Sequence, residues 1–148
     1  MKNFTKDYPI SMQEVFRAEK ILHQFIRPTQ LVYYKSLSDL IGAEIYIKHE
    51  NHNPGGSFKI RGGINIMHYL KKNGVKGVVT FSTGNHGISI AMAAKWFDLE
   101  ALVVVPKGNN PAKNKLIIDT GATLIEEGDT FEEAAKIVEG LGNERGFY

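Results

Sequence analysis

With 148 residues, the sequence is long enough for one domain of ordinary size, and its 43% hydrophobic and 23% charged residues are typical of a globular protein. The formal net charge is only +2 and no run of five basic residues occurs, which argues against a nucleic-acid partner. Because the sequence has no cysteine, disulfides, thiolate metal sites and a cysteine nucleophile are excluded. Residues 1–8 are polar and the apolar runs are short, so we expect a cytoplasmic protein without a membrane segment.

The first third of the chain predicts two helices and a strand. Ser11-Met-Gln-Glu14 reads as a capping box, and the apolar residues after it recur at helical spacing, which predicts a helix over 11–25 that Pro28 ends. A short second helix is predicted before a glycine stop at Gly42. Apolar and polar residues then alternate over 44–50, a pattern that favours a strand.

From residue 57 onward, helical and extended patterns alternate regularly. Ser57 could cap a helix that extends to Lys72. The segments predicted after it are strand 78–81, helix 87–97, strand 101–105, helix 111–120, strand 122–125, helix 130–141 and the beginning of a strand at 147–148. Such alternation indicates βαβ units and an α/β fold with a parallel sheet and flanking helices. Ligands of these sheets bind at the carboxyl ends of the strands.

A lysine follows a glycine turn in Gly55-Gly-Ser-Phe-Lys-Ile-Arg-Gly62. Lys59 is placed where its amine could attack an aldehyde, provided that the amine is partly neutral, and burial or a nearby Arg61 would favour the neutral form. The glycines allow a flat ligand to approach the backbone closely. The alternative interpretation is a solvated helix residue, which is the ordinary state of a lysine.

A second motif, Ser82-Thr-Gly-Asn-His-Gly87, links a predicted strand to the next helix. Consecutive backbone N–H groups at a helix N-terminus can bind a carboxylate or a phosphate. Ser82 and Thr83 add hydroxyl groups, Asn85 adds an amide, and the His86 ring could stack, donate or carry a proton. The alternative is a polar loop in which Ser82 caps the helix and His86 is only exposed.

Together, the two motifs resemble the paired signatures of fold-type-II enzymes that use pyridoxal 5'-phosphate (PLP), in the threonine/serine dehydratase and serine racemase group. Ser57-Phe-Lys-Ile-Arg-Gly62 is followed about 25 residues later by Ser82-Thr-Gly-Asn-His-Gly87, and Gly77-Val-Val-Thr-Phe81 between them also matches. The resemblance covers residues 27–148. It implies the fold of the N-terminal half of such an enzyme.

The resemblance implies a role for each motif residue. Lys59 would hold PLP as a Schiff base, Phe58 would pack beside the cofactor ring, and Asn85 would hydrogen-bond its phenolic oxygen. The substrate carboxylate would be bound, largely through backbone amides, by Ser82, Thr83, Asn85 and His86. Thr83 would also be catalytic, because its hydroxyl stands where a racemase would reprotonate the opposite face of the substrate.

The activity implied is that of a PLP-dependent ammonia-lyase acting on L-threonine or L-serine. The amine of Lys59 would take the Cα proton while the cofactor accepts electrons, the β-hydroxyl would leave, and hydrolysis would give a 2-oxo acid and ammonia. An amino-acid racemase or a β-replacement enzyme on the same scaffold is an alternative. Another is a catalytically silent fragment or binding module. A nucleotide-binding domain has little support, because no G-x-G-x-x-G follows a strand.

The resemblance also predicts how the chain is divided. Residues 1–74 would be the N-terminal part of the large, cofactor-holding domain, and residues 75–148 the small α/β domain. The glycine-rich phosphate cradle, the partner of the pyridine nitrogen and the cation-binding carboxylates of the family belong to a second half, so no metal site is expected here. We expect PLP as cofactor, an amino acid as substrate, and a homo-oligomer without nucleic-acid or membrane partners.

Overall fold

The computed structural model describes residues 11–148, so the expectation about residues 1–8 lies outside the described part. A three-stranded parallel sheet of order β3-β4-β5 forms its centre. The strands are β3 (Gly77–Phe81), β4 (Glu100–Val105) and β5 (Thr123–Glu126). The sheet is in register through Thr80, Val103 and Leu124, which are Cα partners across the three strands. The predicted parallel sheet is thus confirmed.

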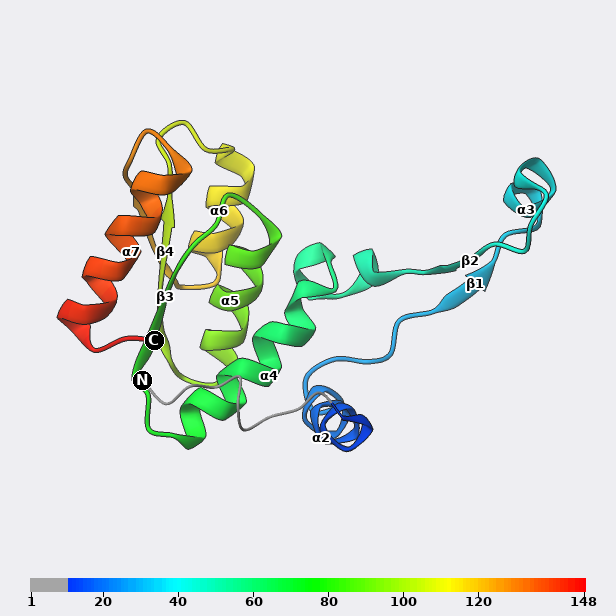
Figure 1. Ribbon diagram of the computed structural model, residues 1–148, viewed down its shortest axis with the longest axis horizontal. Coiled ribbons are helices and arrows are strands. Elements are labelled where there is room, and N and C mark those ends of the chain that lie inside the picture. The colour runs from blue at the N-terminus through cyan, green and yellow to red at the C-terminus, as the bar shows by residue number, and fades with distance from the viewer. Residues whose placement is uncertain (1–10) are drawn as a thin grey trace.

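Helices cover both faces of this sheet (Figure 1). On one side lie α5 (Asn85–Trp96) and α6 (Pro111–Asp119), and on the other lies α7 (Phe131–Arg145). At the end of the chain, Tyr148 donates its N–H to Gly77 O at 3.1 Å and accepts from Val79 N at 2.9 Å. Tyr148 therefore lies alongside β3 as the beginning of a further strand would.

The main core lies between α5 and α4 (Lys59–Lys72). Ile60, Ile64 and Met67 repeat at helical spacing and are fully buried, as expected of an amphipathic helix. A Cβ on Gly63 would lie 2.9 Å from the Ser89 carbonyl oxygen, so a glycine is needed where the two helices meet. The helix α2 (Met12–Leu22) packs against α4 as well. Core residues thus come from both sides of position 74, and the predicted division into domains stays a prediction.

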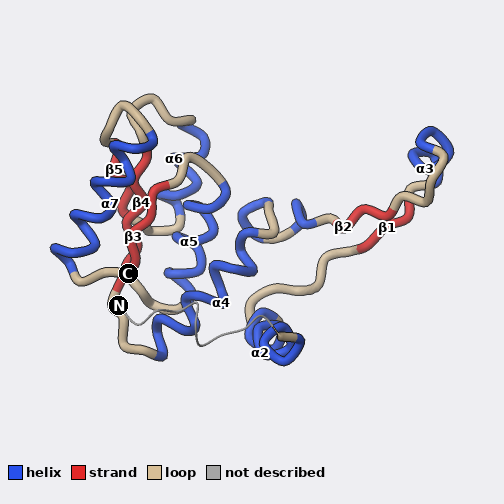
Figure 2. The backbone as a smooth tube through the Cα atoms, viewed as in Figure 1, coloured by secondary structure: helices blue, strands red, loops and turns tan. Residues whose placement is uncertain are grey.

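A hairpin arm extends away from the sheet and its helices (Figure 2). It consists of β1 (Leu31–Tyr33), α3 (Lys35–Ile41) and β2 (Tyr46–Lys48). The two strands are antiparallel. Large apolar side chains are exposed along the arm, namely Leu31, Tyr33, Leu40, Ile41 and Tyr46. The sequence analysis missed β1, and the strand predicted over 44–50 is shorter because two 3-10 turns, η1 (Glu50–His52) and η2 (Pro54–Gly56), follow it.

The predicted caps at Ser11 and Thr130 are present, whereas Phe58 and not Ser57 is at the N-cap position of α4. The Ser11 hydroxyl accepts from Glu14 N at 3.3 Å, and the Thr130 hydroxyl accepts from Glu133 N at 3.2 Å. The first helix ends at Leu22, three residues earlier than predicted. Across residues 11–148, every helix is too short or too polar to span a bilayer.

Candidate active site

The fold brings the two sequence motifs together at the carboxyl edge of the sheet. The second motif begins directly after β3, and α5 starts within it. The first motif includes η2, which packs against α5: a Cβ on Gly55 would lie 3.3 Å from Ile88 Cγ2. Gly55 also has a φ of 77°, a left-handed conformation that suits glycine. The turn before Lys59 is therefore fixed against the helix that carries the second motif.

Lys59 is the first residue of α4 and its amine is available for chemistry. Within residues 11–148, no hydrogen bond or ion pair involves Lys59 Nζ, which lies 5.3 Å from the centre of the Phe58 ring. Both residues are exposed. The described residues therefore do not bury Lys59, and its proposed role stays a prediction.

Arg61 does not point at Lys59 but forms an ion pair with Glu50. Its Nε and Nη2 donate to the two carboxylate oxygens of Glu50 at 2.7 and 2.9 Å. Thr29 and Asn53 also donate to this carboxylate, at 2.6 and 2.7 Å. Chiefly through the Arg61 hydrogen bond, these donors lower the pKa of Glu50 from 4.5 to about 2. Arg61 thus orders the loop that leads to Lys59.

In the loop formed by the second motif, some backbone N–H groups donate hydrogen bonds and others do not. The Ser82 hydroxyl accepts from Gly84 N at 3.3 Å and from Gly87 N, in the first turn of α5, at 2.9 Å, although Gly84 and not Ser82 is at the N-cap position. In contrast, the backbone N–H groups of Thr83, Asn85 and His86 have no acceptor within residues 11–148. The loop therefore presents unpaired donors at the N-terminus of α5, where an anion is stabilised.

An electrostatic interaction links the two motifs. Partial burial of the ring, and secondly the nearby Lys59 ammonium, lower the pKa of His86 below its ordinary value. The residue as a whole keeps much of its surface exposed. The Lys59 amine and the α5 loop thus face the same region, as two parts of one site would.

Sequence reasoning missed two charged residues near this site. Glu50 is paired with a residue eleven positions away, and Lys113 reaches Gly84 from a different helix. Lys113 Nζ would lie 3.0 Å from a Cβ on Gly84. No periodicity or motif spacing predicts such contacts, since they depend on how separate loops meet.

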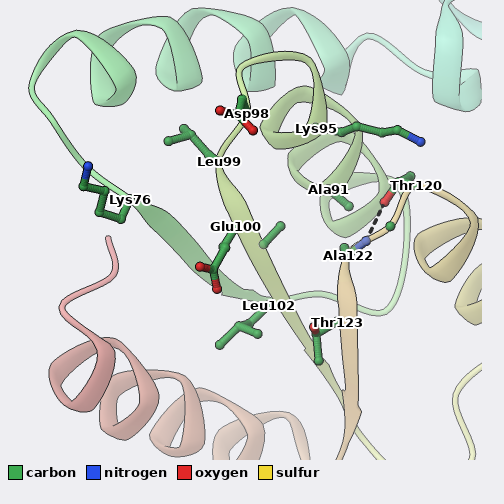
Figure 3. Close-up of a pocket in the computed structure, with 12 residues that line it drawn as sticks. Lys76, Ala91, Lys95, Asp98, Leu99, Glu100, Leu102, Thr120, Ala122 and Thr123 are labelled. Atoms are coloured by element: carbon green, nitrogen blue, oxygen red, sulfur yellow. Dashed lines mark hydrogen bonds between the residues drawn. The ribbon is translucent and has the colours of Figure 1, made fainter.

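A hollow of about 530 Å³ lies at the opposite, amino edge of the sheet (Figure 3). Its charged lining is mixed, with Lys76 and Lys95 beside Asp98 and Glu100. Because ligands of open parallel sheets bind at the carboxyl edge, where both motifs lie, we do not place the site in this hollow. Among the described residues, no three His, Asp or Glu side chains are grouped to hold a metal ion.

The groups at the carboxyl edge define a class of site. An unpaired primary amine can form a bond to an aldehyde, the Asn85 side chain has no partner within residues 11–148, and unpaired N–H groups can bind an anion. This donor set fits the aldehyde and phenolic oxygen of PLP together with a substrate carboxylate. Such a donor set is what a protein that binds a carbonyl cofactor through a lysine requires.

Comparison with known proteins gives the family. The family described as pyridoxal-phosphate dependent enzyme matches residues 22–148, and the chain belongs to this family. The L-threonine ammonia-lyase of Thermotoga maritima is 38% identical over 126 residues, which are 84% of this chain and 31% of that protein. The serine racemase of Dictyostelium discoideum is 34% identical over 124 residues, covering 83% of this chain and 38% of the racemase.

Solved structures agree with this family. A PLP-dependent aspartate racemase superposes with a TM-score of 0.89 at 27% identity, over 95% of this chain and 45% of that chain. The Dictyostelium discoideum serine racemase gives a TM-score of 0.85 at 31% identity, over 93% and 45% of the respective chains. The chain spans about a third of the length of its L-threonine ammonia-lyase relative and under half of each of these structures. The family implies PLP as the cofactor.

Proposed function

We propose that this chain carries the lysine and the carboxylate-binding loop of a PLP-dependent ammonia-lyase that converts L-threonine or L-serine to a 2-oxo acid and ammonia. The observation that carries the proposal is the meeting of the two motifs. The Lys59 ammonium lies close enough to His86 to lower the pKa of the imidazole, and the N–H groups beside His86 are unpaired. The L-threonine ammonia-lyase relatives support the choice of reaction.

Each motif residue has a part in this proposal. Lys59 Nζ would hold the cofactor and, as a free amine, would take the proton from the substrate Cα. Phe58 would lie beside the cofactor ring, and Asn85 would donate to its phenolic oxygen. When bound, PLP accepts the electrons left at Cα. Ser82 keeps the loop in shape through its two accepted hydrogen bonds.

The substrate is oriented by its carboxylate. The backbone N–H groups of Thr83, Asn85 and His86 would hold it at the N-terminus of α5. This fixes the Cα–H bond relative to Lys59, and positioning of this kind can supply much of a rate enhancement. The ordered Arg61–Glu50 pair supports the same geometry, because it holds the loop before Lys59.

Racemisation is the second candidate, and Thr83 is the observation that favours it. Within residues 11–148 the Thr83 hydroxyl has no hydrogen-bond partner, and the residue is exposed in the loop. A hydroxyl there could deliver a proton to the substrate face opposite Lys59. Serine racemase and aspartate racemase are among the relatives and solved structures.

The direct test is to incubate the full-length protein with each amino acid and to analyse the products. We expect 2-oxo acid and ammonia from L-threonine and L-serine, with loss of activity in Lys59→Arg, because a guanidinium cannot act as a neutral amine nucleophile. Formation of D-serine without 2-oxo acid would favour the racemase. Release of 2-oxo acid that persists in Lys59→Arg would refute the role of Lys59.

Three further expectations belong to this proposal. Residues 1–74 are assigned to the large domain and residues 75–148 to the small domain, which domain-wise proteolysis would test. A homo-oligomer is expected, and sedimentation would reveal it. A cytoplasmic location is proposed by analogy with amino-acid metabolism, and cell fractionation would test it.

A further inference from the structure

The first turn of α6 is fixed in place at the carboxyl edge of the sheet. Asn110 caps the helix, its side-chain oxygen accepting from Ala112 N at 2.9 Å and from Lys113 N at 3.4 Å. The side chain of the buried Asn114 donates to Glu126 at 3.1 Å. Because Glu126 is the last residue of β5, this bond ties the helix start to the end of the neighbouring strand. Lys113 lies between these two anchors.

From this fixed position, Lys113 reaches the loop before α5. Its Nζ would lie 3.0 Å from a Cβ on Gly84, the residue between Thr83 and Asn85. The glycine thus leaves the space that the Lys113 side chain occupies. A cation from α6 is therefore placed against the loop that presents unpaired N–H groups.

Among the residues that the structure describes, the Lys113 ammonium has no counterion. Within residues 11–148 no hydrogen bond or ion pair involves it, although the residue is half-buried. By contrast, Lys115 on the same helix is exposed and pairs with Asp119 at 2.9 Å. A partly buried charge without a partner is costly, and an anion bound beside it would offset this cost.

We propose that Lys113 is a carboxylate-binding residue of the site. Its ammonium, together with the N–H groups of Thr83, Asn85 and His86, holds the carboxylate of the amino-acid substrate. The inference rests on the proposed function, because it assigns a further residue to the same loop. It makes the site selective for substrates with a free carboxylate over those in which an amide or an alcohol replaces it.

The expected loss of carboxylate binding follows from the strength of the hydrogen bond that the Lys113 ammonium would donate. A charge-assisted hydrogen bond from an ammonium is about twice as strong as one between neutral groups. Loss of one such bond in a partly shielded site should weaken binding roughly tenfold. Replacing Lys113 with Gln should remove the charge and leave a polar side chain that is one atom shorter, so the fold should remain intact.

The test uses the ¹⁵N-labelled full chain, with the amide signals of Thr83, Asn85 and His86 as the readout. L-Serine and L-serinamide are titrated in parallel, since they differ only in the carboxylate. Inorganic phosphate forms a third titration. The variants are Lys113→Gln, Lys113→Arg and, as a control with the same charge change on the same helix, Lys115→Gln.

We expect L-serine to shift the loop signals of the wild type more strongly than L-serinamide. Lys113→Gln should weaken L-serine binding roughly tenfold and abolish the preference over L-serinamide. Lys113→Arg should restore part of the preference, and Lys115→Gln should bind as the wild type does. Circular dichroism should show that all the variants are folded.

Two results would overturn the inference about Lys113 alone. One is L-serine binding by Lys113→Gln within twofold of the wild type. The other is a loop that prefers inorganic phosphate to L-serine. If the wild-type loop does not respond to L-serine at all, both this inference and the proposed carboxylate site are wrong. The two failures are thus distinguishable.

Discussion

Replacing Arg61 with Met should destabilise the loop that positions Lys59. The Arg61 guanidinium makes two hydrogen bonds to Glu50, at 2.7 and 2.9 Å, and these side chains are 29% and 21% exposed. The hydrogen bonding to Arg61 is the largest single cause of the lowering of the Glu50 pKa from 4.5 to about 2. At 1.36 kcal/mol per pKa unit, such a lowering corresponds to a stabilisation of about 2–3 kcal/mol once the remaining exposure is considered.

The pH dependence follows from the direction of this change. Because the pKa of Glu50 is lowered by folding, the stabilisation is fully present above pH 4.5 and is lost as the pH falls toward 2. The wild type should therefore lose about 2–3 kcal/mol over this range. Arg61→Met should lack the Arg61 part of this stabilisation at pH 7 already and change less on acidification.

Urea unfolding followed by circular dichroism, at pH 7 and at several lower pH values, measures both effects. The control is Lys35→Met, which removes an exposed ion pair with Asp39 in the arm, where the two side chains are 75% and 64% exposed. An exposed pair of this kind contributes about 0.5 kcal/mol or less. Equal losses in Arg61→Met and Lys35→Met would refute the argument, as would an unchanged pH dependence in Arg61→Met.

Three further predictions concern the two motifs. Lys59→Met should raise the pKa of His86, because a nearby positive charge is removed. NMR titration of the imidazole measures this pKa. An unchanged or lower pKa would contradict the proximity of the two motifs. Gly87→Val should cost about 1–3 kcal/mol in urea unfolding. The reason is that a Cβ at Gly87 already lies 3.2 Å from Ser82 Cβ, and unchanged stability would show that the capped loop can move. Thr83→Ala in the intact enzyme should preserve 2-oxo acid release and reduce any racemisation, measured by chiral chromatography, whereas an equal fall in both activities would make Thr83 a carboxylate ligand or a structural residue.

Much of the fold could be predicted because the patterns that specify its helices and strands extend over a few neighbouring residues. The alternation after residue 57 gave the parallel sheet, and the Ser11 and Thr130 caps were visible as short patterns. By contrast, β1 is three residues long, too short for a reliable alternation of apolar and polar residues. It pairs with β2, which follows only after the helix α3, so no short pattern links the two strands.

The candidate site was predictable in its motifs but not in its contacts. The glycine turn before Lys59 and the polar loop after β3 are features of the sequence. However, the direction of Arg61 depends on Glu50, whose position is set by the turn that follows β2. The approach of Lys113 to Gly84 depends on the packing of two helices. Such contacts link residues far apart in sequence, and no periodicity specifies them.

The central claim is that Lys59 is the lysine that binds the cofactor. Borohydride reduction of the chain in the presence of PLP, followed by peptide mapping with mass spectrometry, tests it most directly. Reduction fixes the bond between the lysine amine and the cofactor aldehyde, so the modified residue can be located. We predict that the label is found on Lys59 and is lost in Lys59→Arg. A label on another lysine, or one spread evenly over the surface lysines, would contradict the claim.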